Sequence, residues 1–162
     1  MGIPVNLHAT ALTPCVLYVD DEASNLQAFM AAFRKNFQVL LAGSLQEAWE
    51  LLSKHDVHVV MADQRMPGTL GTELLTLVRD RYPRIRRMLV TGYSDIQAVI
   101  DAINNGGVMR YISKPWQPEQ VLAAVQKAFT EVRCERDQDE HAARLTEANS
   151  QLEFALRQAL LS

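Results

Sequence analysis

The sequence predicts an α/β protein with a doubly wound parallel sheet of five strands. Five short apolar runs alternate with segments of helical periodicity, and the connections between them are short. Such runs are typical of parallel strands buried on both faces, and repeated βα units join them by right-handed crossovers. Polar residues stand at or just beyond the ends of four of the runs. In an open α/β sheet this is the edge where ligands bind.

The expected strands are short runs in which Val, Ile and Leu predominate. A run of this length that is bounded by polar or turn-forming residues fits a strand better than a helix. In chain order the runs are Cys15–Val19, Phe37–Ala42, Val57–Ala62, Arg87–Thr91 and Val108–Ile112.

The segments between the strands carry apolar residues at the helical spacing i, i+3, i+4, i+7, which places them on one face. The clearest sets are Leu26, Phe29, Met30 and Phe33, and Ile96, Val99, Ile100 and Ile103. Capping-box spacing marks two helix starts, at Ser44 with Glu47 and at Ser94 with Gln97. Asn105-Gly106-Gly107 predicts a helix end, because both residue types tolerate positive φ.

The last helix is expected to begin near Pro118, a residue suited to the first helical turn. It carries apolar residues at helical spacing, and no Gly or Pro follows over residues 133–162. We therefore expect a flexible N-terminal arm over residues 1–13, a globular domain over 14–132 and a helical extension over 133–162. The apolar residues of this helix are Val121, Leu122, Val125, Phe129 and Val132.

The helical extension has a heptad pattern. Position a is taken by Ala142, Asn149 and Leu156, and position d by Leu145, Leu152 and Ala159. A buried Asn at position a favours a parallel two-stranded register. We expect a homodimer whose coiled coil leads to an output domain that is absent from this chain. A solvated helix packed back on the domain is the alternative, since the seam is shorter than roughly three to four heptads.

Composition excludes several classes of function. Of the 162 residues, 48% are hydrophobic and 22% are charged, as in soluble globular proteins. The net charge of -3 offers no basic stripe, so direct binding of nucleic acid is not expected. No segment approaches the roughly 18 apolar residues of a membrane span, and we expect a cytoplasmic protein without membrane contact. Cys15 and Cys134 have no spacing typical of a zinc site or a disulfide.

The polar residues at the strand ends predict a charged pocket. They are Asp20 and Asp21, Asp63, Thr91 and Lys114. Two like charges about 4 Å apart cost on the order of 4 kcal/mol at an effective dielectric of about 20, so three carboxylates require a positive partner. Carboxylate oxygens suit Mg²⁺, and a carboxylate can also act as a nucleophile toward phosphorus. The arrangement favours phosphoryl chemistry.

The segments VDDE, MADQRMPG, LVTGYSD and RYISKPW resemble the receiver domain of bacterial two-component response regulators over about residues 14–132. The resemblance implies a flavodoxin-like strand order, 2-1-3-4-5, and a signalling phosphoacceptor that catalyses only its own phosphorylation and dephosphorylation. The wording DQRMPG, TGY and KPW resembles receivers fused to HD-GYP, GGDEF or hydrogenase-type regulator output domains.

The resemblance also implies site roles. Asp63 would accept a phosphoryl group from a sensor histidine kinase or a phosphotransfer protein. Mg²⁺, or Mn²⁺ in its place, would be bound by Asp20, Asp21, Asp63 and the backbone carbonyl of Arg65, with Asp20 acting largely through water. Lys114 would pair with one phosphoryl oxygen.

Two further positions follow from the resemblance. Thr91 would hydrogen-bond a phosphoryl oxygen, and Tyr111 would turn inward as Thr91 moves, which changes the face of the fourth helix, fifth strand and last helix. Arg65 and Tyr93 would flank the path of the hydrolytic water. The alternatives are that Tyr111 packs in the core and that Arg65 and Tyr93 are solvated loop residues.

Three other functions fit the sequence less well. A haloacid-dehalogenase phosphatase would carry its nucleophile on the first strand and its acidic pair late, the reverse of this chain, and it would have a substrate cap. A nucleotide- or flavin-binding module would have a glycine-rich first turn, where this chain has Asp20-Asp21-Glu22. A pseudo-receiver scaffold is disfavoured because the acids, Thr91 and Lys114 are all present.

Overall fold

Strands and helices alternate along the chain as predicted. The computed structural model describes residues 13–92, 95–105 and 107–161, and in these it has five strands and five helices. The strands form one parallel sheet in the order β2-β1-β3-β4-β5, which confirms the predicted fold and strand order. The strands are β1 (Cys15–Val19), β2 (Gln38–Ala42), β3 (Val59–Asp63), β4 (Arg86–Thr91) and β5 (Arg110–Ser113).

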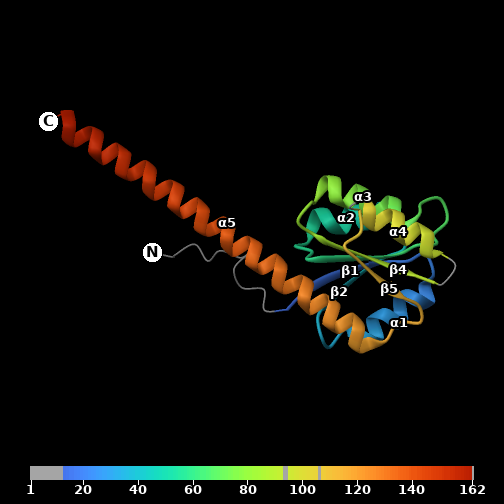
Figure 1. Cartoon of the computed structure of the whole chain (residues 1–162). Coiled ribbons are helices and arrows are strands. Elements are labelled where there is room, and N and C mark those ends of the chain that lie inside the picture. The colour runs from blue at the N-terminus through green and yellow to red at the C-terminus, as the bar shows by residue number, and fades with distance from the viewer. Residues whose placement is uncertain (1–12, 93–94, 106, 162) are drawn as a thin grey trace. The chain divides into compact units, whose positions relative to one another are not determined.

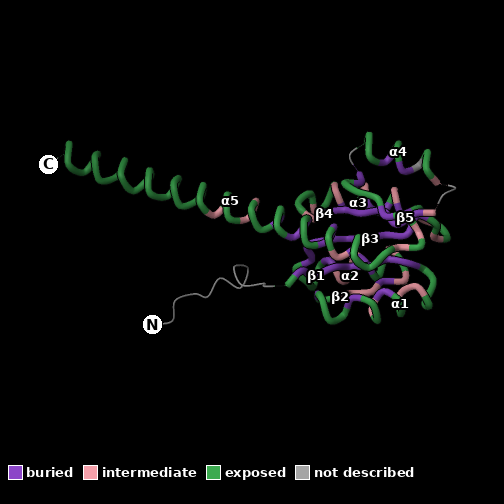
Figure 2. Tube along the Cα trace, turned by 60° about the horizontal axis from the view of Figure 1, so that its bottom comes forward, coloured by how far each residue is buried: buried purple, intermediate pink, exposed green. Residues whose placement is uncertain are grey.

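Helices cover both faces of the sheet. They are α1 (Ala23–Phe33), α2 (Leu45–Lys54), α3 (Gly71–Arg81), α4 (Ile96–Asn104) and α5 (Pro118–Leu161). Figure 1 shows α2, α3 and α4 on one face and α1 on the other. The first turns of α5 share an apolar cluster with α1 through Val121 and Val125. The three central strands, β1, β3 and β4, are therefore buried from both sides, as Figure 2 shows, whereas most residues of the edge strands β2 and β5 are half-buried or exposed.

Two strands are displaced from their apolar runs. The runs Val57–Ala62 and Val108–Ile112 begin two residues before β3 and β5, and neither includes the polar last residue of its strand. Backbone pairing sets these limits, because Asp63 pairs with Val90 and Ser113 with Thr91. Ladder hydrogen bonds do not depend on side-chain polarity.

The capping box predicted before α2 is present in part. Ser44 Oγ accepts a hydrogen bond from Glu47 N–H (3.2 Å), and the Glu47 carboxylate accepts one from Gly43 N–H (2.7 Å). Ser94 of the second expected box lies outside the described residues. Asp95 precedes α4 and makes no side-chain cap.

The end of α4 coincides with the predicted stop, but the backbone there is not left-handed. The helix ends at Asn104, and Asn105 has a φ of -84°. Gly106 lies outside the described residues. Among the residues described, only Gly68 has a positive φ, of 81°, in the loop that leads to α3.

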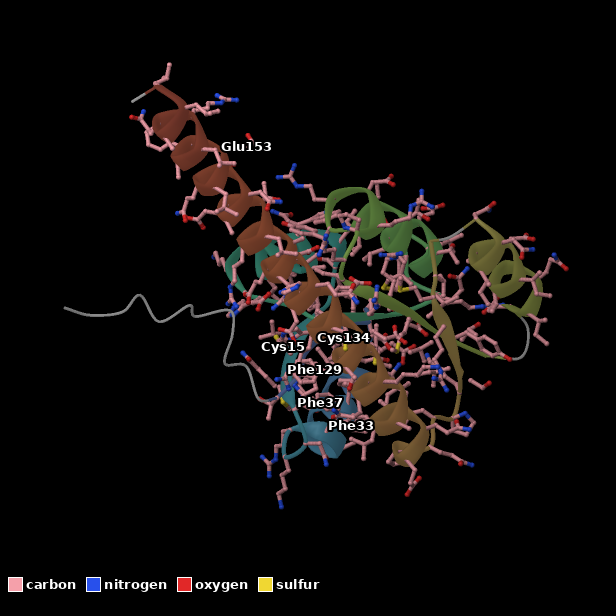
Figure 3. All side chains as sticks on the ribbon, turned by 60° about the vertical axis from the view of Figure 1, so that its left-hand side comes forward. Cys15, Phe33, Phe37, Phe129, Cys134 and Glu153 are labelled. Atoms are coloured by element: carbon pink, nitrogen blue, oxygen red, sulfur yellow. The ribbon has the colours of Figure 1, made fainter. Side chains whose placement is uncertain are left out.

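An aromatic cluster lies between the sheet and α1. Tyr18 stacks on Phe29 with 4.3 Å between ring centroids. Phe33 and Phe37, labelled in Figure 3, stack with 5.4 Å between their centroids. Trp116, in the loop before α5, meets Tyr18 edge-on at 5.7 Å. These contacts fix the Tyr18 ring two residues before Asp20, the first acid of the acidic pair.

Helix α5 is continuous from Pro118 to Leu161, as the lack of Gly and Pro predicts. The chain divides into two compact units, Met1–Phe129 and Thr130–Ser162. All the residues of the predicted seam are exposed, and Leu145, Leu152 and Leu156 are 53%, 62% and 62% exposed. Nowhere in the described part of the chain does a helix combine the length and the apolarity needed to cross a membrane.

The two cysteines, labelled in Figure 3, are free thiols in different surroundings. Cys15 is buried at the start of β1, and Cys134 is exposed on α5. Burial raises the pKa of the Cys15 thiol to about 11. Cys15 is therefore a packing residue, because the reactive thiolate is not populated at neutral pH.

Gly71, the first residue of α3, lies against the strand that carries Asp63. A Cβ here would overlap the Asp63 carbonyl oxygen and come within 2.9 Å of Leu89 Cδ1. We expect Gly71→Ala to lower the free energy of unfolding by about 1–3 kcal/mol, as measured by urea unfolding. Gly92→Ala is the matched control, because a Cβ there has no heavy atom within 4 Å. Equal losses in both variants would contradict the packing argument.

Candidate functional site

Three carboxylates meet at the carboxyl ends of β1 and β3. One oxygen each from Asp20, Asp21 and Asp63 lies within 4.8 Å of the others. Asp20 and Asp63 are buried, with 0% and 6% of their surface exposed, and Asp21 is exposed. The parallel pairing of β1 with β3 brings these strand ends together, as the sequence predicts.

Asp20 is fully buried because three donors face its carboxylate. The Tyr18 hydroxyl and Asn25 Nδ2 both donate to Oδ2, at 2.8 and 3.0 Å, and the Glu22 N–H donates to Oδ1 at 3.0 Å. Hydrogen bonds of this kind stabilise an ionised carboxylate. Burial, and after it the bond to Asp20, raises the pKa of Tyr18 well above its ordinary value, so the hydroxyl remains a donor.

Lys114 supplies positive charge to the cluster. Its Nζ lies 2.5 Å from Asp63 Oδ1. Burial is the largest cause of the raised pKa of Asp63; the hydrogen bond and charge of Lys114 oppose it, and the charges of Asp20 and Asp21 add to it. Negative charge on Asp63 is therefore only partly compensated.

Thr91 is the last residue of β4, the strand next to β3. It is 4% exposed, and its Oγ1 donates to the Gly92 carbonyl at 3.3 Å. Asp63 pairs with Val90, so Thr91 lies one residue beyond the position opposite Asp63. The hydroxyl thus belongs to the same edge of the sheet as the acids, as predicted.

Tyr111 lies in β5 but not in the core. It is 51% exposed, whereas Ile112 is buried, so the interpretation of Tyr111 as a core residue is wrong. Its ring lines an apolar cavity of about 340 Å³ with Thr91 and with α4 residues that include Ile96 and Ile100. Thr91 and Tyr111 therefore line the same cavity.

Arg65 joins the loop after β3 to the start of α4. Its Nε lies 3.1 Å from Asp95 Oδ2, and its Nη2 donates to Asp95 Oδ1 at 3.2 Å. The hydrogen bond to Asp95 raises the pKa of Arg65. Arg65 is therefore an ion-paired residue rather than a simply solvated one. Tyr93, expected to flank the same path, lies outside the described residues.

Sequence reasoning missed three residues that support the acids, namely Tyr18, Asn25 and Gln64. Gln64 is 3% exposed; its Oε1 accepts from Thr72 N–H and its carbonyl from Gly71 N–H, both at 3.0 Å. It ties the start of α3 to the residue after Asp63. Strand alternation could have pointed to Tyr18, since residues two apart share a face. No comparable pattern marks Asn25 or Gln64.

Comparison with known proteins assigns the chain to a family. The family model described as response regulator receiver domain matches residues 16–126. The hydrogenase transcriptional regulatory protein HoxA of Cupriavidus necator is 41% identical over 113 residues, which are 70% of this chain and 23% of that protein. HoxA of Bradyrhizobium diazoefficiens is 37% identical over 122 residues, which are 75% of this chain and 25% of that protein. This chain thus spans about a quarter of the length of these relatives.

Solved structures agree in fold. The signal receiver domain of an HD domain-containing protein from Pseudomonas fluorescens superposes with a TM-score of 0.72 at 29% identity, covering 82% of this chain and 98% of that one. A structure described as adenylate cyclase from Rhodopirellula baltica superposes with a TM-score of 0.74 at 31% identity, covering 80% of this chain and 96% of that one. These matches support neither the phosphatase nor the nucleotide-binding alternative. The chain belongs to the response regulator receiver domain family.

Proposed function

We propose that this receiver domain is a phosphoacceptor and that Asp63 takes a phosphoryl group from the phosphohistidine of a sensor kinase or a phosphotransfer protein. The observation that carries the proposal is the cluster of three carboxylates within 4.8 Å of one another, with Lys114 at 2.5 Å from Asp63. Family membership supports it, because receiver domains of response regulators are signalling domains.

The donor set fits Mg²⁺, or Mn²⁺ in its place. Carboxylate oxygens are hard ligands, and a cation here would offset the burial and the neighbouring acids that raise the pKa of Asp63. Asp21, Asp63 and the Arg65 carbonyl would bind the ion directly. Asp20 would act largely through water, since three donors already use its oxygens. When bound, the ion would supply charge neutralisation to the phosphoryl oxygens.

Transfer to Asp63 exchanges one bond to phosphorus for another. A carboxylate oxygen of Asp63 forms a bond to phosphorus as the phosphorus–nitrogen bond to histidine breaks, and the nitrogen keeps the electron pair. Lys114, already in contact with Asp63 Oδ1, would pair with a phosphoryl oxygen. The Thr91 hydroxyl, at the same edge, would donate to another.

Movement of Thr91 would be relayed through Tyr111. Both residues line the cavity of about 340 Å³ beside α4. When Thr91 turns toward the phosphoryl group, the exposed Tyr111 ring can enter this cavity and alter the face of α4, β5 and the first turns of α5. The free energy that couples two sites in this way is usually about 1–3 kcal/mol.

We further propose that the seam residues of α5 form a parallel homodimer. Leu145, Leu152 and Leu156 are exposed in the single chain, and a second copy would bury them while Asn149 sets the register. The HoxA relatives are named as transcriptional regulators and are about four times as long as the part that matches. Phosphorylation would regulate an output domain of that kind through α5.

Replacement of Asp63 by Asn exchanges the nucleophilic carboxylate for a neutral amide. After incubation with Mg²⁺ and a small acyl phosphate, intact mass spectrometry should show one added phosphoryl group on the wild type and none on Asp63→Asn. Asp80→Asn, at an exposed position on α3, is the matched control and should be labelled like the wild type. Labelling of Asp63→Asn would refute the assignment.

The raised pKa of Asp63 predicts a pH-dependent stability. The carboxyl binds a proton more tightly in the folded than in the unfolded chain, so ionisation at pH 7 destabilises the fold and the penalty disappears as pH falls through the folded pKa. Without Mg²⁺, Asp63→Asn should unfold at a higher urea concentration than the wild type at pH 7. This difference should shrink as the pH is lowered toward 3.8, the ordinary pKa of the carboxyl.

Asp80→Asn again serves as the control for this measurement and should show no such pH-dependent gain. Lys114 does not offset the gain in Asp63→Asn, because its side chain is 32% exposed and can turn to water. A variant Asp63→Asn that is less stable than the wild type at pH 7 would contradict the argument.

Asn149 is the polar residue of the proposed seam. Asn149→Ile should raise the thermal unfolding temperature and broaden the distribution of oligomers seen by sedimentation, because it exchanges a register-setting polar pair for apolar contact. Gln151→Ile, at heptad position c outside the seam, is the control. A wild-type chain that sediments as a monomer at high concentration, with and without a phosphoryl mimic, would rule out the dimer.

A further inference from the structure

The hydroxyl of Tyr18 reaches the acidic cluster from inside the core. Tyr18 is 0% exposed, and its hydroxyl donates to Asp20 Oδ2 at 2.8 Å. Its ring is held by stacking on Phe29 and by the edge contact with Trp116. The ring therefore holds its hydroxyl, and with it the carboxylate of Asp20, in a fixed position.

The hydrogen-bonding capacity of Asp20 is almost fully used. An ionised carboxylate has about four lone-pair positions, two on each oxygen. Tyr18 and Asn25 take both positions on Oδ2, and the Glu22 N–H takes one on Oδ1. One position on Oδ1 is left for a metal ion or for water bound to it.

We propose that Tyr18 is a positioning residue of the metal site, which acts by orienting Asp20. Its hydroxyl and the Asn25 amide hold Oδ2, so that Oδ1 alone serves the ion or its bound water. This inference rests on the proposed function, because it takes the three carboxylates to be a divalent-cation site. Neither Tyr18 nor Asn25 lies in the segments by which the sequence resembles the receiver family.

The hydroxyl can be removed without disturbing the ring. Tyr18→Phe keeps the stacking on Phe29 and deletes one donor to Asp20. Loss of a group that orients a metal ligand typically weakens binding by about 10- to 100-fold. Because Asn25 still holds Oδ2, we expect a loss of about tenfold, at the lower end of that range.

The test is the affinity of the full chain for Mn²⁺, measured by electron paramagnetic resonance of the free ion. The wild type should bind, and Tyr18→Phe should bind about tenfold more weakly. Tyr82→Phe is the matched control and should bind like the wild type, because it removes a hydroxyl from a ring that packs on Trp49. Equal affinities of the wild type and Tyr18→Phe would overturn the inference and leave the metal site intact. No binding by the wild type would instead refute the metal site.

A purely structural role for the hydroxyl is separated by thermal unfolding with and without Mg²⁺. A structural defect would lower both unfolding temperatures equally, which would overturn the inference, whereas a positioning role reduces the increase that Mg²⁺ produces. Asn25→Ala is a second variant in case Tyr18→Phe does not fold. It removes the other donor to Oδ2 from a half-buried position on α1, and it should also weaken Mn²⁺ binding. Unchanged affinity in Asn25→Ala would overturn the inference as well.

Discussion

Repulsion among three carboxylates at one edge of the sheet governs the arrangement of the side chains around them. Asp20 and Asp63 are almost completely buried, and a buried charge is tolerated only where donors or opposite charges surround it. Asp20 has three donors and Asp63 has Lys114. Burial still raises the pKa of Asp63. The three carboxylates thus form a group that could hold a metal ion.

The parallel sheet holds the three acids close together in spite of this repulsion. Its register brings the ends of β1 and β3 together, while apolar clusters on both faces hold the strands beneath them. The close approach of Gly71 to Asp63, and the hydrogen bonds of Gln64 to the start of α3, tie the loop after β3 to the helix that follows it. The acids thus lie at the ends of strands that apolar clusters hold from both faces.

Two connections lead from the acids toward α4. One is the apolar cavity that Thr91 shares with Tyr111, and the other is the ion pair between Arg65 and Asp95. Both begin within two residues of a group at the acidic edge. Helix α5 contributes apolar residues to the first compact unit and continues unbroken as the second.

The order of residues alone was enough to predict the α/β class, the strand order that the family resemblance implies, and the group Asp20, Asp21, Asp63, Thr91 and Lys114. It did so because burial imposes short apolar runs on strands, and because parallel strands present their last residues at a common edge. The same local rules predicted an unbroken α5 and the hydroxyl half of the cap before α2. They failed at the limits of β3 and β5, where pairing with a neighbouring strand overrides side-chain polarity.

The contacts around the acids could be found only in the folded chain. The ion pair of Arg65 with Asp95 joins residues 30 positions apart, and the place of Tyr111 beside the cavity depends on where α4 packs. The bond from Asn25 to Asp20 depends on the turn that follows β1. Such contacts arise from the path of loops and from packing between distant segments, and neither leaves a periodic trace in the order of residues.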